Sequence, residues 1–320
     1  MAVHDPHPIV NAMSVDVEDY FQVSGFDEVV SRGSWDQRES RVVANTERLL
    51  QMFDEAGVRA TFFILGWVAS RHPALVRRIA AQRHEVASHG YGHRLVYDQT
   101  PQQFRDDVRR AKGVLEMISG RPVAGFRAPS YSVTSRSMWA LDVLIEEGYQ
   151  YDASIFPIHH DRYGIPSSPR HVHLMRRNAG SIVEAPGSTV RYGRVNLPIG
   201  GGGYFRLLPY AWTRWGIRRL NRIERRPAIF YLHPWEIDPG QPRITAPAMS
   251  RFRHYCNLSK TEARLRHVMR DFKFSTVADV VRTVTPVFEA QSEVAKSAPA
   301  SLLAARAATA PAAVERITWA

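Results

Sequence analysis

The sequence predicts an α/β protein whose mainly parallel sheet closes into a distorted (β/α) barrel of about seven strands, with irregular β insertions. Two observations lead to this expectation. Short apolar runs alternate with helically spaced apolar residues along 9–289, and this alternation is typical of parallel α/β folds. Side chains able to do chemistry stand at the C-terminal ends of several apolar runs, where barrel enzymes carry their active sites. The length of 320 residues is sufficient for one such barrel.

The first half of the chain shows the clearest alternation. Apolar runs predict strands over residues 9–15 and 60–65, then up to His89, and over 124–127 and 149–155. Apolar residues at three- and four-residue steps predict helices that begin near Asn45, at Pro73, at Thr100-Pro101 and at Thr134, and that end near Gly57, Gln82, Gly120 and Gly148. Asn45 and Thr134 are the residue types expected to cap such helices.

The second half shows a looser pattern. Residues 157–203 contain short β-like pieces and a glycine run, which we interpret as loops and strands decorating one face of the barrel. Residues 209–226 predict a helix in which tryptophans alternate with arginines; we expect a barrel helix with a solvated arginine face rather than one lying on a membrane. A strand over 228–232, a helix over 261–272 and a strand over 274–277 would complete the fold.

Both ends of the chain differ from this barrel. Residues 1–8 form a short extension without the apolar run of a secretory signal. Residues 290–320 are rich in alanine, proline and serine, a composition that predicts a disordered tail. No apolar segment approaches the roughly 20 residues that span a bilayer. We therefore expect a cytoplasmic protein, with peripheral contact at the inner membrane surface as an open alternative.

The charge balance is strongly basic. The formal net charge is +11 and the pI about 10.1, which suits an anionic polysaccharide, a membrane surface or nucleic acid as partner, although a solvated basic surface has the same composition. The sequence carries no recognisable nucleic-acid-binding module, so we expect no nucleic-acid partner. The single Cys256 excludes an intramolecular disulfide framework.

A metal-ligand pattern follows the third predicted strand. His89 and His93 are separated by Gly90-Tyr91-Gly92, a spacing that allows a tight turn to direct both imidazoles at one point. Hydrolytic zinc-type sites combine two such histidines with a carboxylate and leave one position open. Glu18 or Asp19, at the end of the first predicted strand, could supply the carboxylate. The pattern thus predicts a divalent metal, with zinc as the expected ion.

Other residues at strand ends would complete a hydrolytic site. Asp16 could deprotonate a water molecule, and His233 could protonate a leaving group. Arg127 could hold the base through a bidentate pair, and backbone N–H groups after Pro129 could stabilise an oxyanion.

Ordinary structural roles are alternatives for several of these residues. Acidic side chains at strand ends often cap loops, and a histidine before a proline is often structural. Trp235 could be a core residue or a platform for a sugar ring, and His84 most simply serves the entry of a strand. Rival metal candidates are His159 with His160 and His171 with His173, which lie in loosely patterned segments.

Taken together, these residues resemble the motifs of the NodB-homology polysaccharide deacetylases, carbohydrate esterase family 4. The resemblance covers residues 9–284 and is nearest to the subgroup associated with exopolysaccharide and exosortase gene clusters, whose opening is similar to Ser14–Phe21. The family's His-Ser/Thr-x-x-His matches His89–His93 with Gly90 in place of the hydroxyl residue. Its Arg-x-Pro-aromatic matches Arg127–Pro129, with Ser130 and then Tyr131 following. Its apolar residue before histidine matches Tyr231-Leu232-His233.

The first family motif departs most, because Val17 stands where the family has its metal-binding aspartate. The resemblance then implies Asp16 as the base and Glu18 as the ligand, with Asp19 in reserve. It also implies that Asp152 orients His233. The resemblance further implies that apolar residues before His233 surround the acetyl methyl group. The residues implied to contact substrate are Pro129, Ser130, Tyr131, Tyr231, Leu232 and Trp235.

The expected function is metal-dependent removal of acetyl groups from N-acetylated sugars of an exopolysaccharide or its lipid-linked precursor. Exopolysaccharide assembly proteins are possible partners. Two alternatives remain open: a non-catalytic carbohydrate-binding component of a polysaccharide assembly system, and an amidohydrolase acting on small amides.

Overall fold

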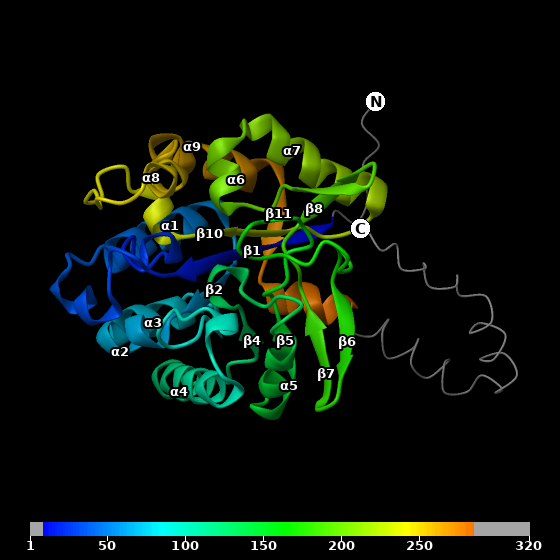
Figure 1. Cartoon of the computed structure of the whole chain (residues 1–320). Helices are drawn as coiled ribbons and strands as arrows, with labels where there is room; N and C mark the ends of the chain where they lie inside the picture. The colour runs from blue at the N-terminus through cyan, green and yellow to red at the C-terminus, as the bar shows by residue number, and fades with distance from the viewer. Residues whose placement is uncertain (1–8, 285–320) are drawn as a thin grey trace, which may run out of the picture.

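Strand β1 (Val10–Val17) lies at the centre of the sheet in the computed structural model of the chain, which describes residues 9–284 (Figure 1). It pairs in parallel with three strands, β2 (Thr61–Ile64), β10 (Ile229–Leu232) and β11 (Lys273–Ser275). The sheet continues through β3 (Glu85–Ser88), β4 (Gly125–Phe126), β5 (Tyr151–Asp152), β7 (Gly180–Glu184) and β6 (His173–Arg177).

The parallel arrangement confirms the predicted fold class. Strands β10, β1, β2, β3, β4, β5 and β7 follow one another in parallel, and β6 adds an antiparallel edge. Strands β4 and β5 are shorter than the apolar runs that predicted them. The region 157–203 was expected to decorate one face of the barrel, which holds only for the separate hairpin of β8 (Thr189–Tyr192) and β9 (Val195–Pro198). Strands β6 and β7 of the same region extend the main sheet, because β7 pairs in parallel with β5.

The glycine run after β9 packs closely rather than forming a loose loop. Gly200 accepts a hydrogen bond from the backbone N–H of Tyr231 at 2.8 Å, and Gly201 forms an isolated bridge with the same residue. A Cβ atom on Gly201 would lie 1.9 Å from the carbonyl oxygen of Tyr231, and the φ of Gly201 is +120°. Only glycine permits this contact, so the run brings the chain against β10 at the open side of the barrel.

Helices cover the outside of the sheet (Figure 1). They are α1 (Val42–Ala56), α2 (Gly66–Arg71), α3 (Pro73–Ala81), α4 (Pro101–Ser119), α5 (Trp139–Glu146), α6 (Gly202–Leu207), α7 (Tyr210–Arg219), α8 (Ala248–Tyr255) and α9 (Leu258–Asp271). Thr100 caps α4 through a reciprocal pair of hydrogen bonds with Gln103. Two other caps were predicted wrongly: α1 begins three residues before Asn45, and α5 begins only at Trp139, after a turn in which Ser137 binds Thr134.

The side chains on the two faces of β1 lie in different surroundings. Met13, Val15 and Val17 belong to the main apolar core, whereas Ser14 and Asp16 both accept hydrogen bonds from Arg127. Because successive side chains of a strand point to opposite faces, polar side chains of β1 gather on the inner face of the barrel. Val17 therefore fills a core position instead of entering the site.

Helix α7 packs as a barrel helix. Thr213, Gly216 and Ile217 are buried, while the side chain of Trp215 is 42% exposed. A π-helical turn (Leu220–Glu224) ends the element. Within residues 9–284, no helix has the length and apolar character required to cross a membrane. The extension 1–8 and the predicted tail 290–320 lie outside the described residues.

Candidate functional site

Glu18, His89 and His93 converge at the C-terminal ends of β1 and β3. One ligand atom from each lies within 4.8 Å of the others, and all three residues are buried. The Oε2 atom of Glu18 lies 2.6 Å from Nε2 of His93 and 3.8 Å from Nε2 of His89. The predicted ligand set is therefore brought together at one point.

An aspartate of α4 holds the turn that carries the two histidines. The carboxylate of Asp107 accepts the backbone N–H of Tyr91 at 2.7 Å and that of Gly92 at 3.2 Å. Gly90 has a φ of +74°, and a Cβ on it would lie 2.8 Å from Oδ2 of Asp107. Glycine thus stands where the family has a hydroxyl residue because the turn is left-handed and crowded. The sequence analysis missed Asp107, which is distant in the chain.

The donor set fits a divalent cation. The Nδ1 atom of His89 lies 2.7 Å from the carbonyl oxygen of Arg127, a contact that places the proton on Nδ1 and leaves the lone pair of Nε2 facing Glu18. Burial lowers the pKa of His89 to about 4, so the imidazole is neutral, as a metal ligand must be. Buried Oε2 of Glu18 faces Nε2 of both histidines, at 2.6 and 3.8 Å, so all three ligand atoms could contact one cation.

Glu18 rather than Asp19 faces the histidines. Asp19 turns toward the start of α1, where its Oδ2 accepts hydrogen bonds from the backbone N–H of Arg41 at 2.9 Å and of Val42 at 3.2 Å. It thus satisfies the free N–H groups that begin a helix. The reserve position given to Asp19 is not supported, because its carboxylate is occupied elsewhere.

Asp16 is held beside this cluster by Arg127. Nη1 of Arg127 donates to Oδ1 of Asp16 at 2.7 Å and to Oγ of Ser14 at 2.8 Å. The contact with Asp16 is therefore through a single nitrogen, not the bidentate pair that was expected. Both Asp16 and Arg127 are at most 2% exposed. The other carboxylate oxygen, Oδ2, lies 3.9 Å from Nε2 of His233.

His233 is oriented by Glu236, not by Asp152. Nδ1 of His233 lies 2.6 Å from Oε1 of Glu236, and Oε2 of Glu236 accepts from Nε of Arg206 at 2.6 Å. Burial alone would lower the pKa of His233, but the surrounding carboxylates, Glu18 first, raise it to about 9. The hydrogen-bonded series of His233, Glu236 and Arg206 thus favours an imidazolium whose Nε2 faces the site.

Asp152 contacts Ser154 and Glu184, whereas His233 is bound by Glu236, so the orienting role predicted for Asp152 is not met. It is fully buried and accepts a hydrogen bond from Ser154. The paired strands β5 and β7 place it opposite Glu184, and burial together with Asp152 raises the pKa of Glu184 well above its usual range. This pair is a buried acidic contact beneath the site. Glu236 was missed although it stands three residues after His233 in a proline-initiated turn, where a local contact is common.

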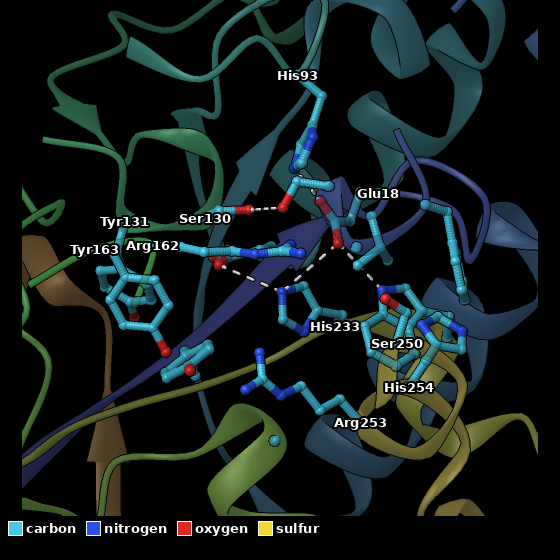
Figure 2. Close-up of a pocket in the computed structure, with 18 of the residues that line it drawn as sticks. Glu18, His93, Ser130, Tyr131, Arg162, Tyr163, His233, Ser250, Arg253 and His254 are labelled. Carbon is cyan, nitrogen blue, oxygen red and sulfur yellow. Dashed lines mark hydrogen bonds and ion pairs between the residues drawn. The ribbon is translucent and has the colours of Figure 1, made fainter. Parts of the chain in front are cut away.

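A cleft of about 200 Å³ opens over these residues. Figure 2 shows His93, Glu18 and His233 gathered around its centre. Of the residues expected to contact substrate, Ser130, Tyr131, Tyr231 and Trp235 line the cleft, whereas Pro129 and Leu232 are buried behind it. The backbone N–H groups of Tyr131 and Ser132 are donated within their own turn. Of the N–H groups after Pro129, that of Ser130 therefore stays the predicted donor to an oxyanion.

Trp235 is a buried supporting residue rather than a platform for a sugar ring. Its ring lies between His233, at 5.0 Å, and His254, at 4.1 Å, nearly parallel to both. Its Nε1 donates to Oε1 of Glu18 at 3.2 Å. Trp235 is 3% exposed, so it mainly supports the histidine and the carboxylate from below.

The rival histidines do not form a metal site among residues 9–284. His171 contacts Glu224 at 3.1 Å, and His160 stacks on Tyr163 with ring centres 3.8 Å apart. Nδ1 of His84 accepts the backbone N–H of Ala60 at 3.1 Å, in agreement with its expected place at a strand entry. In this part of the chain, the Glu18 cluster alone gathers three possible ligands.

Two family models match consecutive segments of the chain. Residues 27–151 match the polysaccharide deacetylase family, and residues 153–282 match a domain of unknown function, DUF3473. The first match contains His89, His93 and Arg127. The second contains His233 and Glu236.

Curated relatives match over part of the chain. A peptidoglycan deacetylase-like protein, FGM2, of Gibberella zeae is 31% identical over 34% of this chain and 32% of its own length. A peptidoglycan-N-acetylglucosamine deacetylase of Bacillus cereus is 26% identical over 30% and 36%, respectively. A chitooligosaccharide deacetylase of Bradyrhizobium is 31% identical over 31% and 43%. The chain thus spans about a third of the length of the first of these relatives.

The fold is shared with a crystal structure from Mycobacterium smegmatis whose assignment as a polysaccharide deacetylase is provisional. The TM-score is 0.56 at 19% identity, and the match covers 89% of this chain and 93% of that chain. At this identity the likeness concerns the fold alone. It extends across both halves of the chain, so the two matched segments build one barrel.

Proposed function

We propose, from the polysaccharide deacetylase domain of NodB type in residues 27–151, that this chain hydrolyses the amide bond of N-acetylated sugars and releases acetate. One observation supports this most strongly. A buried Glu-His-His cluster lies beside a carboxylate and a histidine in a single cleft. Amide hydrolysis at neutral pH calls for such a combination of a cation site, a base and an acid.

Glu18, His89 and His93 would hold the cation. Glu18 offers a buried carboxylate oxygen that faces both imidazoles, and His89 offers a neutral nitrogen. A bound divalent cation would polarise the acetyl carbonyl and increase the acidity of a nearby water. Zinc is the proposed ion, because two histidines and one carboxylate are a common catalytic zinc set.

Asp16 would act as the base. Arg127 fixes Oδ1 of Asp16, so Oδ2 remains directed toward the cleft to accept a proton from water. The immobile carboxylate removes the need to order the base during the reaction.

His233 would act as the acid. Its Nδ1 proton is held by Glu236, and Nε2 lies 3.9 Å from Asp16 and 3.7 Å from Glu18, on the side of the cation site. The carboxylates around His233 raise its pKa, which favours the imidazolium that can protonate the departing amine.

We extend the proposal to an exopolysaccharide or its lipid-linked precursor as substrate, with the net charge of +11 as support. The test is acetate release from chitotetraose and other N-acetylated oligosaccharides by the wild type, Asp16→Asn and His89→Ala. The proposal expects release by the wild type only. Glycan binding without any acetate release by the wild type would favour the non-catalytic alternative.

A further inference from the structure

Two arginines project into the cleft and have no part in the chemistry described above. Arg162 follows β5 in the chain, and Arg253 lies in α8; both line the cleft. Figure 2 shows their side chains extending toward His233 from different segments. Any sugar seated over the Glu18 cluster would therefore lie within reach of two guanidinium groups.

These two charges are not neutralised by the protein. The guanidinium of Arg162 makes no ion pair or hydrogen bond within residues 9–284. Arg253 contacts Asp161 at 3.4 Å, with side chains 52% and 58% exposed, and such an exposed pair contributes only about 0–1 kcal/mol. Both arginines thus remain available to a ligand.

The acids of the cleft already have cationic partners. Asp16 is paired with Arg127, and Glu236 is paired with Arg206 and His233. Glu18 faces two imidazoles and the proposed cation. The positive charges of Arg162 and Arg253 are therefore not required to neutralise the carboxylates of the site.

A solvated basic surface is the simplest alternative, because the chain has 42 lysines and arginines. Placement argues against it here. The two residues come from segments separated by 91 positions and still converge on one cleft. Guanidinium groups pair well with carboxylate and phosphate oxygens, through two parallel hydrogen bonds where the geometry allows.

We infer that Arg162 and Arg253 bind an anionic group of the saccharide, a carboxylate or a phosphate, near the sugar that carries the acetamide. The inference rests on the proposed deacetylation in the same cleft and specifies its substrate class. A neutral N-acetylglucosamine oligomer would leave both guanidinium groups unpaired.

The test compares three probes: neutral chitotetraose, a hyaluronan tetrasaccharide carrying carboxylates, and UDP-N-acetylglucosamine carrying a diphosphate. The quantity measured is the ratio of kcat/KM for each anionic probe to that for chitotetraose. Arg162→Gln and Arg253→Gln should each lower this ratio about tenfold, as expected for the loss of one charge-assisted hydrogen bond. Arg162→Lys should show a smaller decrease in this ratio than Arg162→Gln, because lysine keeps the positive charge. The more strongly affected probe distinguishes carboxylate from phosphate.

Arg121→Gln is the matched control, because this exposed arginine precedes β4 at the opposite end of the strands; its ratio should equal that of the wild type. Equilibrium binding of the same probes to the wild type and to each variant is measured in parallel. If no probe is hydrolysed, the proposed function fails while the binding ratios still test the arginines. Equal ratios in the wild type and in both glutamine variants, in turnover and binding alike, would overturn the inference.

Discussion

The segments 27–151 and 153–282 contribute different parts of one site. The first, which matches the polysaccharide deacetylase family, supplies two of the proposed cation ligands and the arginine that fixes the proposed base. The second, which matches a domain of unknown function, supplies His233, its partner Glu236 and the arginines at the cleft. Glu18 and Asp16 precede both and join them, since β1 pairs with strands of each half. Cation binding and proton donation should therefore be separable by mutation.

The largest effect is expected in the first segment. His89→Ala removes one of three ligands from a buried cluster, so the protein should lose its bound metal and at least about 10³-fold in kcat/KM. Metal content after dialysis and acetate release measure the two losses together. A variant that keeps one equivalent of metal and ordinary turnover would remove His89 from the proposed site.

A mutation in the second segment should lower kcat while the bound metal is retained. Glu236→Gln weakens the support of His233 without touching a ligand, so we expect retained metal, little change in KM and a fall in kcat of about 10–100-fold. Because Glu236 is one of the carboxylates that raise the pKa of His233, its neutralisation should also move the alkaline limb of the kcat profile to lower pH.

Folding must be checked for this variant, since Glu236 also neutralises the buried Arg206. Thermal unfolding and metal content of Glu236→Gln provide that check. A kcat that falls with an unchanged pH profile would assign Glu236 to stability instead of positioning.

A smaller effect distinguishes the two neighbouring acids of the first motif. Asp19→Ala removes the acceptor for two N–H groups at the start of α1, so the free energy of unfolding should fall by about 1–2 kcal/mol. Metal content should not change. Asp106→Ala, on the exposed side of α4, is the control. Loss of metal in Asp19→Ala would return Asp19 to the ligand set.

The last effect depends on pH and concerns a histidine of the first segment that lies outside the Glu18 cluster. Burial lowers the pKa of His84 to about 4, so the unfolded chain binds an extra proton between about pH 6.5 and 4. Stability contributed by neutral His84 is then present above pH 6.5 and is lost as the pH falls toward 4, by up to about 3 kcal/mol. Urea unfolding of the wild type and His84→Asn at pH 7 and 5 should show a smaller loss in the variant. Equal losses would contradict this role.

Sequence patterns identified the parallel barrel because its strands are buried and apolar and its helices are amphipathic. They also located the histidines, Asp16 and Arg127, which lie at or near the C-terminal ends of strands. They could not choose between Glu18 and Asp19, because the choice depends on how the chain turns after β1. Asp152 was given a role that belongs to Glu236, since the depth of a strand end in the barrel depends on strand register. Arg162 and Arg253 follow no motif, and only the fold brings them to the cleft.

Acetate release by metal-free protein, measured while zinc is added in equivalents, tests the central claim most directly. The account predicts no release without metal, an increase that levels off at one equivalent for the wild type, and no increase for Glu18→Gln. Chitotetraose is the probe, so the result does not depend on the arginines of the cleft. Undiminished acetate release by the metal-free wild type, or equal activation of Glu18→Gln, would contradict the assignment of Glu18, His89 and His93 as the cation site.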